Sequence, residues 1–171
     1  MSVEARMKDL LAKMDFDFSR FTMDSFTTWV QQRVGRKIHF VLWDMPPGMF
    51  GVWLSDAEDP VEYVFIDKNV APLHQAHIQL HELGHIVCGH PTMRLTKAQM
   101  GVLLAQAEQE PKILQQALLR SPGKEELEQE AEIFAALIQH QVISHERLQQ
   151  LSVAASSNEQ VVGHLQSLEL I

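Results

Sequence analysis

The segment between Pro72 and Pro91 constrains the fold of this 171-residue chain more than any other. Its apolar residues recur at intervals of three and four positions, a spacing that places them on one face of an α-helix. These residues are Leu73, Ala76, Leu80, Leu83 and Val87. Gly89 and then Pro91 follow, in the order in which helices usually end. We therefore expect a helix over 73–88 that buries one face against the rest of the protein.

Three short segments that are rich in strand-forming residues precede this helix. They span 37–43, 50–54 and 61–66. The break at 46–48, Pro-Pro-Gly, and an acidic turn at 55–60 separate them. Because these connections are too short for parallel crossovers, we expect a small antiparallel sheet.

Helical periodicity continues on both sides of this sheet. Before it, apolar residues mark one helix face that ends at Gly35. Those residues are Phe21, Phe26, Trp29, Val30 and Val34. After the 73–88 helix, the same periodicity predicts five more helices. They cover 96–109, 111–120, 124–141, 145–151 and 157–169, the last with a Ser156–Glu159 capping box.

This order of helices, a small sheet and several further helices is typical of an α+β protein. No linker divides the sequence, so we expect a single domain over 1–171. Its parts are N-terminal helices (1–36), the small sheet (37–66), a central set of helices (72–140) and C-terminal helices (141–171).

Composition excludes several classes of protein. The single cysteine, Cys88, excludes an internal disulfide framework and a zinc ribbon built from several cysteines. The net charge of −8 argues against a broad surface for nucleic acid or anionic membrane. The sequence shows neither a signal-peptide-like start nor an apolar run of membrane-spanning length. We therefore expect a soluble, cytoplasmic protein with no direct binding to nucleic acid or membrane.

The 73–88 helix carries the pattern H-E-x-x-H, with His81, Glu82 and His85 at its fixed positions. Residues four apart lie on the same helix face, so both imidazoles can reach one metal ion. Zinc accepts two imidazole nitrogens at about 2.0–2.1 Å. Glu82 is one residue further round the helix, where it can take a proton from a metal-bound water. The pattern therefore predicts a Zn²⁺ site on an active-site helix, with Glu82 as the catalytic base.

Two histidines leave a catalytic zinc site one protein ligand short. The 124–141 helix offers the richest supply of carboxylates, and Glu128 and Glu130 flank its apolar face on opposite sides. Periodicity alone does not choose between these two residues. Glu132 lies four residues after Glu128, where it can accept a hydrogen bond from the other ring nitrogen of a ligating histidine.

The remaining histidines and Cys88 have plainer interpretations. We interpret His74, His77 and His90 as residues of a polar face or of a cleft rim, and Cys88 as a small buried hydrophobic residue. Tyr63 or a neighbouring histidine such as His77 is a candidate for the cleft or for stabilising an oxyanion.

Two segments together resemble the ImmA/IrrE family of bacterial zinc metallopeptidases. They are the HELGH helix, which follows a strand ending in Ile66–Asp67, and the later helix segment 128–135, Glu-Gln-Glu-Ala-Glu-Ile-Phe-Ala. The family shows E-x-x-A-N/D-x-F-A-A in that helix, so Glu132 stands where Asn or Asp is usual. The resemblance implies a zincin-like fold in which Glu128 is the third zinc ligand. It also implies a protein substrate of the helix-turn-helix repressor type.

We therefore expect a hydrolase, a zinc-dependent metalloprotease that cleaves a regulatory protein. The edge of the sheet, at 61–66, is the expected place for an extended substrate to pair. An alternative is a binding module that retains the metal site but holds a regulator or toxin–antitoxin partner without cutting it. An intact Glu82 favours the enzyme, since a scaffold has no chemical need for this carboxylate.

Overall fold

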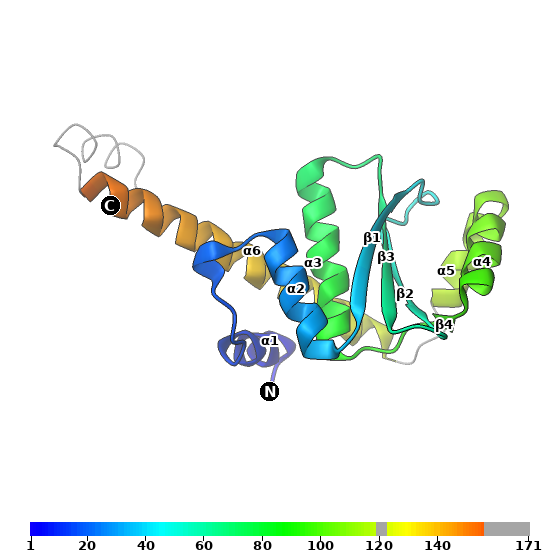
Figure 1. Cartoon of the computed structure of the whole chain (residues 1–171), viewed down its shortest axis with the longest axis horizontal. Helices are drawn as coiled ribbons and strands as arrows, with labels where there is room; N and C mark the ends of the chain where they lie inside the picture. The colour runs from blue at the N-terminus through cyan, green and yellow to red at the C-terminus, as the bar shows by residue number, and fades with distance from the viewer. Residues whose placement is uncertain (119–122, 156–171) are drawn as a thin grey trace.

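The computed structural model describes residues 1–118 and 123–155, and within these ranges the chain is an α+β protein (Figure 1). The strands are β1 (Lys37–Trp43), β2 (Gly51–Asp56), β3 (Val61–Asp67) and β4 (Arg94–Leu95). The helices are α1 (Val3–Ala12), the short 3-10 helix η1 (Phe18–Arg20), α2 (Met23–Val34), α3 (Pro72–Cys88), α4 (Lys97–Gln109), α5 (Pro111–Leu118) and α6 (Lys124–Ala155). The strands and helices expected between residues 37 and 109 are thus confirmed.

The sheet is mixed, so the expectation of an antiparallel sheet is wrong. Its strand order is β1-β3-β2-β4, with β1 parallel to β3, β2 antiparallel to β3, and β4 parallel to β2. A parallel pair needs a connection of about a dozen residues or more. Here β2 itself lies within the connection from β1 to β3 and supplies that length. As a result β3 is a central strand, and 61–66 is not an edge.

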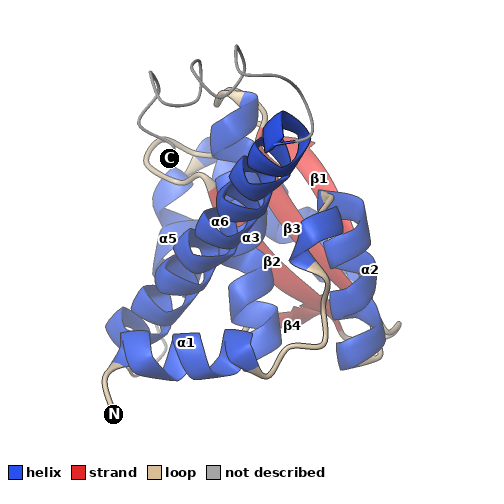
Figure 2. Ribbon diagram, turned by 90° about the vertical axis from the view of Figure 1, so that its left-hand side faces the viewer, coloured by secondary structure: helices blue, strands red, loops and turns tan. Residues whose placement is uncertain are grey.

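Helices cover both faces of this sheet. Helices α2 and α3 pack on one face, with α6 behind α3 and α1 against α6, while α4 covers the other face (Figures 1 and 2). Along β3 the side chains alternate between the two faces. Val64 and Ile66 join the core under α3, and Tyr63 and Phe65 face the side of α4.

Helix α3 buries more than the single apolar stripe that its sequence predicts. Leu80 and Leu83 are buried as expected, but Leu73, in the first turn, is 79% exposed. Ile78 and Ile86 are buried in addition. The reason is that α3 lies between the sheet and α6, so two sides of the helix lose contact with water.

Helix α6 is longer than the sequence predicts. The sequence predicts an apolar face made of Leu127, Ala131, Phe134, Ala135 and Ile138. The last four are fully buried, whereas Leu127 is partly exposed and lines the cleft described below. The separate helix expected over 145–151 is instead part of α6, because the sequence 124–155 contains no glycine or proline to interrupt it. The helix and capping box expected beyond residue 155 lie outside the described residues. Within the described ranges, neither α6 nor any other helix combines the length and the apolarity that crossing a membrane requires.

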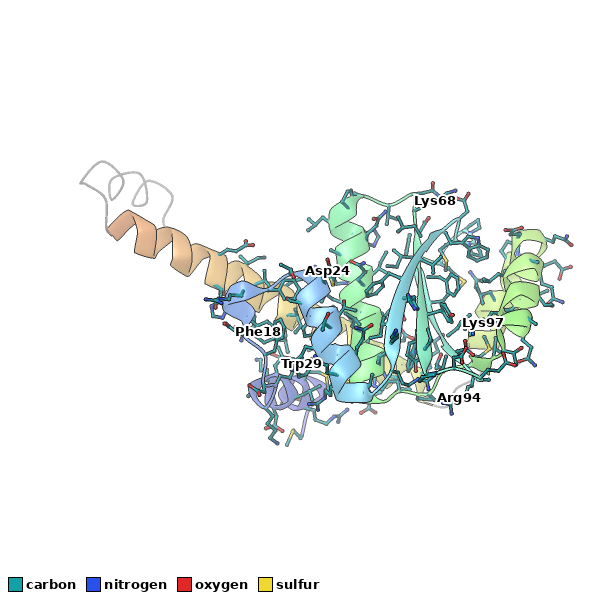
Figure 3. The ribbon with its side chains drawn as sticks, in the orientation of Figure 1. Phe18, Asp24, Trp29, Lys68, Arg94 and Lys97 are labelled. Carbon is teal, nitrogen blue, oxygen red and sulfur yellow. The ribbon has the colours of Figure 1, made fainter. Side chains whose placement is uncertain are left out.

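Ion pairs lie at both ends of the sheet (Figure 3). At one end Lys97, in the first turn of α4, lies 2.9 Å from Asp56 and 2.6 Å from Asp59. At the other end Lys68 lies 2.9 Å from Asp44. The ion pairs of Lys97 tie the start of α4 to the end of β2. They therefore hold α4 over the second face of the sheet.

Helices α3 and α6 pack tightly against each other at Gly84. A Cβ placed on Gly84 would lie 3.0 Å from Cδ1 of Phe134 and 3.2 Å from Cα of Ala131. The second of these atoms is backbone, so it has no rotamer by which to move away. A glycine at this position therefore sets the spacing between the two helices.

We expect Gly84→Ala to destabilise the protein by about 1–3 kcal/mol, the usual cost of overpacking a tight core. Urea unfolding, followed by circular dichroism, measures this change. Gly101→Ala is the matched control, because Gly101 also lies inside a helix but a Cβ there meets no atom within 4 Å. Equal stability of the Gly84 variant and the wild type would show that α6 is not held at this spacing.

Candidate metal centre

Helices α3 and α6 bring His81, His85 and Glu128 together, within reach of a single ion. His81 Nε2 lies 3.2 Å from His85 Nε2 and 3.2 Å from Glu128 Oε2, and His85 Nε2 lies 3.6 Å from Glu128 Oε2. Donors placed tetrahedrally at 2.0–2.1 Å from a zinc ion lie about 3.3 Å from one another. The three separations therefore suit a small tetrahedral cation without rearrangement of either helix.

Each ligand atom is placed by a simple feature of its helix. His81 and His85 occupy successive turns of α3, so both point to one side. Glu128 lies in the second turn of α6, next to the buried stripe that begins at Ala131. Because Ala131 packs against Gly84, the carboxylate of Glu128 arrives directly opposite the two imidazoles.

The electrostatics of this group favour a bound cation. The hydrogen bond with His81 and the nearby imidazole of His85 lower the pKa of Glu128 far below its usual range. Burial lowers the pKa of His81, but the hydrogen bond to Glu128 and the charge of Glu82 outweigh it, and the net shift is upward. The ionised carboxylate of Glu128 thus places a negative charge where the two imidazoles meet, and this charge favours a metal cation there.

Glu82 lies beside these ligands but does not join them. It is buried, with 8% of its surface exposed, and it borders the same cleft. Burial raises the pKa of its carboxyl group. A Cβ on Gly51 of β2 would lie 3.0 Å from Glu82 Oε1 and 2.5 Å from Ile78 Cγ2, so only glycine leaves room for this carboxylate. A carboxylate with a raised pKa next to a metal site is suited to accept a proton.

Glu132 holds His81 from outside the group of ligands, as the sequence predicts. Its Oε2 lies 3.2 Å from His81 Nδ1 and 3.2 Å from His77 Nε2. His77 in turn lies 3.1 Å from Gln139 Oε1. The ring nitrogen of His81 that does not face the other ligands therefore has a partner, which fixes the orientation of the imidazole.

Glu130, the alternative ligand that periodicity leaves open, does not lie with His81 and His85. It points to another side of α6, where its carboxylate lies 2.8 Å from His90 Nε2 and 2.6 Å from Arg6 Nη2. Together with Cys88, His90 and Glu130 form a second group of residues that could hold a metal. Burial raises the pKa of the Cys88 thiol to about 11, which disfavours the thiolate that a metal requires.

The candidate metal ligands lie in a cleft of about 740 Å³. Strand β2 and the residues before it form one wall. Helix α3, the segment after it, Ala117 of α5 and the start of α6 form the remainder. His77 lines this cleft, as expected. Tyr63 does not: it lies on the opposite face of the sheet, where its ring stacks on His39 at 5.9 Å. The expected role of Tyr63 at the cleft therefore finds no support in the fold.

Two residues near the ligands make contacts that the sequence does not predict. His90 lines the cleft, as expected, but it is not a residue of an exposed polar face. His90 is buried, with 7% of its surface exposed, and its Nδ1 lies 2.8 Å from His85 Nδ1. Arg6, at the other end of the sequence, reaches Glu126 and Glu130 of α6. The sequence places His90 directly after the helix-ending Gly89 but does not predict its contacts with His85 and Glu130, and no pattern in the sequence points to Arg6.

Comparison of the chain with protein-family models, with curated proteins and with solved structures gave no match. The geometry of this cleft is therefore the main guide to what the protein does.

Proposed function

We propose that this protein is a zinc-dependent endopeptidase, in which His81, His85 and Glu128 bind zinc and Glu82 is the general base. One observation carries the proposal. The donor atoms of His81, His85 and Glu128 lie at the separations of a tetrahedral site, and the buried carboxylate of Glu82 borders the same cleft without being one of these donors. The motifs that resemble ImmA/IrrE metallopeptidases support the same assignment.

The donor set favours zinc over other common cations. Magnesium and calcium prefer shells made entirely of oxygen, whereas two imidazoles and one carboxylate suit zinc. Three protein ligands leave a fourth position for water, as in catalytic zinc sites. When bound, zinc supplies Lewis acidity, which makes a water more acidic and polarises the carbonyl of the peptide bond.

The residues of the chain perform the remaining tasks. The Glu82 carboxylate accepts a proton from the attacking water and then donates it to the nitrogen of the departing amine as the C–N bond breaks. Its burial suits this role, because a raised pKa brings the group closer to neutral pH. Glu132 keeps His81 oriented through Nδ1.

We propose that an extended segment of a protein substrate pairs with β2, in place of the segment 61–66 expected from the sequence. Strand β4 covers only Ser55 and Asp56 of β2. The stretch from Gly51 to Trp53 borders the cleft with an edge that β4 does not pair, where the hydroxyl of Thr92 donates to the carbonyl oxygen of Trp53 at 2.6 Å. Adding a strand to such an edge is a common way to bind peptides. As the substrate we propose a regulatory protein of the repressor type, which the family resemblance implies.

Zinc-dependent cleavage of peptides tests the proposal. The chain is freed of metal with a chelator, reloaded with one equivalent of zinc, and incubated with a proteome-derived peptide mixture. We expect new peptide termini, detected by mass spectrometry, with the zinc-loaded protein and none with the metal-free protein. A zinc-loaded protein that leaves both this mixture and unfolded protein substrates intact would favour the alternative, a metal-containing binding module.

A further inference from the structure

His85 has an unusual partner on the side that faces away from the proposed metal. Its Nδ1 lies 2.8 Å from Nδ1 of His90, and the two rings are close to perpendicular, at 70°. His90 Nε2 lies 2.8 Å from Glu130, and Glu130 accepts a hydrogen bond from Arg6 at 2.6 Å. Four side chains thus form one continuous series of contacts from α1 to the metal centre.

Local backbone geometry places His90 there. Gly89 has a φ of +68°, a left-handed conformation that ends α3 and turns the chain back. The backbone N–H of His90 then donates to the carbonyl oxygen of His85, at 3.0 Å. This turn brings His90 under the last turn of α3, beside His85, and buries its ring against Glu130.

Hydrogen-bond chemistry assigns the protons along this series. If His85 Nε2 carries the lone pair for the metal, the proton of the neutral ring lies on Nδ1 and is donated to His90 Nδ1. His90 then carries its own proton on Nε2 and donates it to the carboxylate of Glu130. Arg6, which can only donate, occupies the other oxygen of that carboxylate. With neutral imidazoles, this assignment gives each contact one donor and one acceptor.

We propose that His90 is a positioning residue, which links His85 to Glu130 and Arg6 and thereby holds His85 in the tautomer that presents Nε2 to zinc. The inference rests on the proposed zinc site and adds to it the device that orients its second histidine. His81 is held directly by a carboxylate, Glu132, whereas His85 is held through a second, buried imidazole.

A second metal site is the competing interpretation, since Cys88, His90 and Glu130 could themselves hold an ion. The contacts oppose it. Glu130 is already paired with the guanidinium of Arg6, which would repel a cation, and the Cys88 thiol contacts Met7 Sδ at 4.0 Å. The two interpretations differ in metal stoichiometry and in the state of His90.

Zinc affinity in His90 variants tests the positioning role. We expect His90→Phe to lower zinc affinity by about 10–100-fold, the usual effect of removing a partner of a ligating histidine. His90→Asn should recover most of that loss, because its side-chain oxygen can accept the hydrogen bond from His85. His39→Phe, remote from the cleft, is the matched control and should bind zinc like the wild type. Competition with a chromophoric chelator measures each affinity.

Nitrogen-15 NMR of the imidazoles gives a readout that a merely structural role would not move. In the zinc-loaded wild type we expect the proton of His85 on Nδ1 and that of His90 on Nε2, with one zinc per chain. In His90→Phe, the hydrogen-bonded Nδ1–H signal of His85 should lose its downfield shift. The positioning role would be overturned by His90 protonated on Nδ1, by His90 bound to a second zinc ion, or by unchanged zinc affinity in His90→Phe.

These outcomes separate the two proposals. Zinc binding with the expected tautomers but without peptide cleavage would overturn the endopeptidase and leave the role of His90 intact. Peptide cleavage by the zinc-loaded wild type, together with unchanged zinc affinity in His90→Phe, would support the endopeptidase and overturn the role of His90. A wild-type protein that binds no zinc would overturn both.

Discussion

Replacing Glu82 by glutamine should lower the rate of peptide cleavage by about 10²–10⁴-fold, the contribution expected of a general base. Glutamine has nearly the same shape as glutamate but cannot accept the proton of the attacking water. Since Glu82 is not one of the three proposed zinc ligands, the variant should still bind zinc with unchanged stoichiometry. Cleavage of a peptide identified in the mixture, followed at saturating zinc, measures the rate.

Glu125→Gln provides the matched control for this experiment. Glu125 is an exposed glutamate in the first turn of α6, and it does not line the cleft. Its replacement should leave the cleavage rate as it is in the wild type. A Glu82→Gln protein that binds zinc and cleaves peptide at the wild-type rate would exclude Glu82 as the base.

Replacing Glu128 by alanine should have the largest effect on metal binding, a loss of at least about 100-fold in zinc affinity. The reason is that removal of a direct ligand costs more than the 10–100-fold typical of residues that only support a ligand. It also removes the negative charge that faces His81 and His85. Isothermal titration calorimetry of the metal-free protein with zinc measures this loss.

Glu130→Ala is the informative comparison, because sequence periodicity does not choose between the two glutamates. Glu130 contacts His90 and Arg6 and neither of the two HELGH histidines, so its loss should weaken zinc binding less than the loss of Glu128. The reverse order, with zinc lost only from the Glu130 variant, would show that the metal binds elsewhere.

Local patterns predict the elements that carry the site. The spacing of apolar residues in 73–88, with Gly89 after them, is sufficient to place His81 and His85 on one side of a helix. The buried face of α6 at Ala131 and Phe134 follows from the same periodicity. Both depend only on residues within a few turns of one another.

Long-range features could not be predicted in this way. The parallel pairing of β1 with β3 depends on which edge of the β2–β3 hairpin the first strand joins, and strand propensity does not distinguish the two edges. The choice of Glu128 over Glu130 depends on how α6 is rotated against α3. That rotation is set by the contact of Gly84 with Ala131 and Phe134, which no single helix encodes.

The contacts of His90 bring together three parts of the chain that lie far apart in the sequence. Its approach to His85 requires the left-handed turn at Gly89, and its second contact requires Glu130 from α6. Arg6 then comes from the first helix of the chain. A sequence pattern predicts that a histidine lies just past the end of a helix. It does not predict that this histidine contacts His85 and Glu130.

X-ray absorption at the zinc edge tests most directly whether one ion is held by His81, His85 and Glu128. The protein loaded with one equivalent of zinc should show only nitrogen and oxygen neighbours at about 2.0–2.2 Å, with the multiple scattering of two imidazoles. Glu128→Ala should lose this signature at the same zinc concentration. A sulfur neighbour at about 2.3 Å would place the ion at Cys88 instead and contradict the assignment of this metal centre.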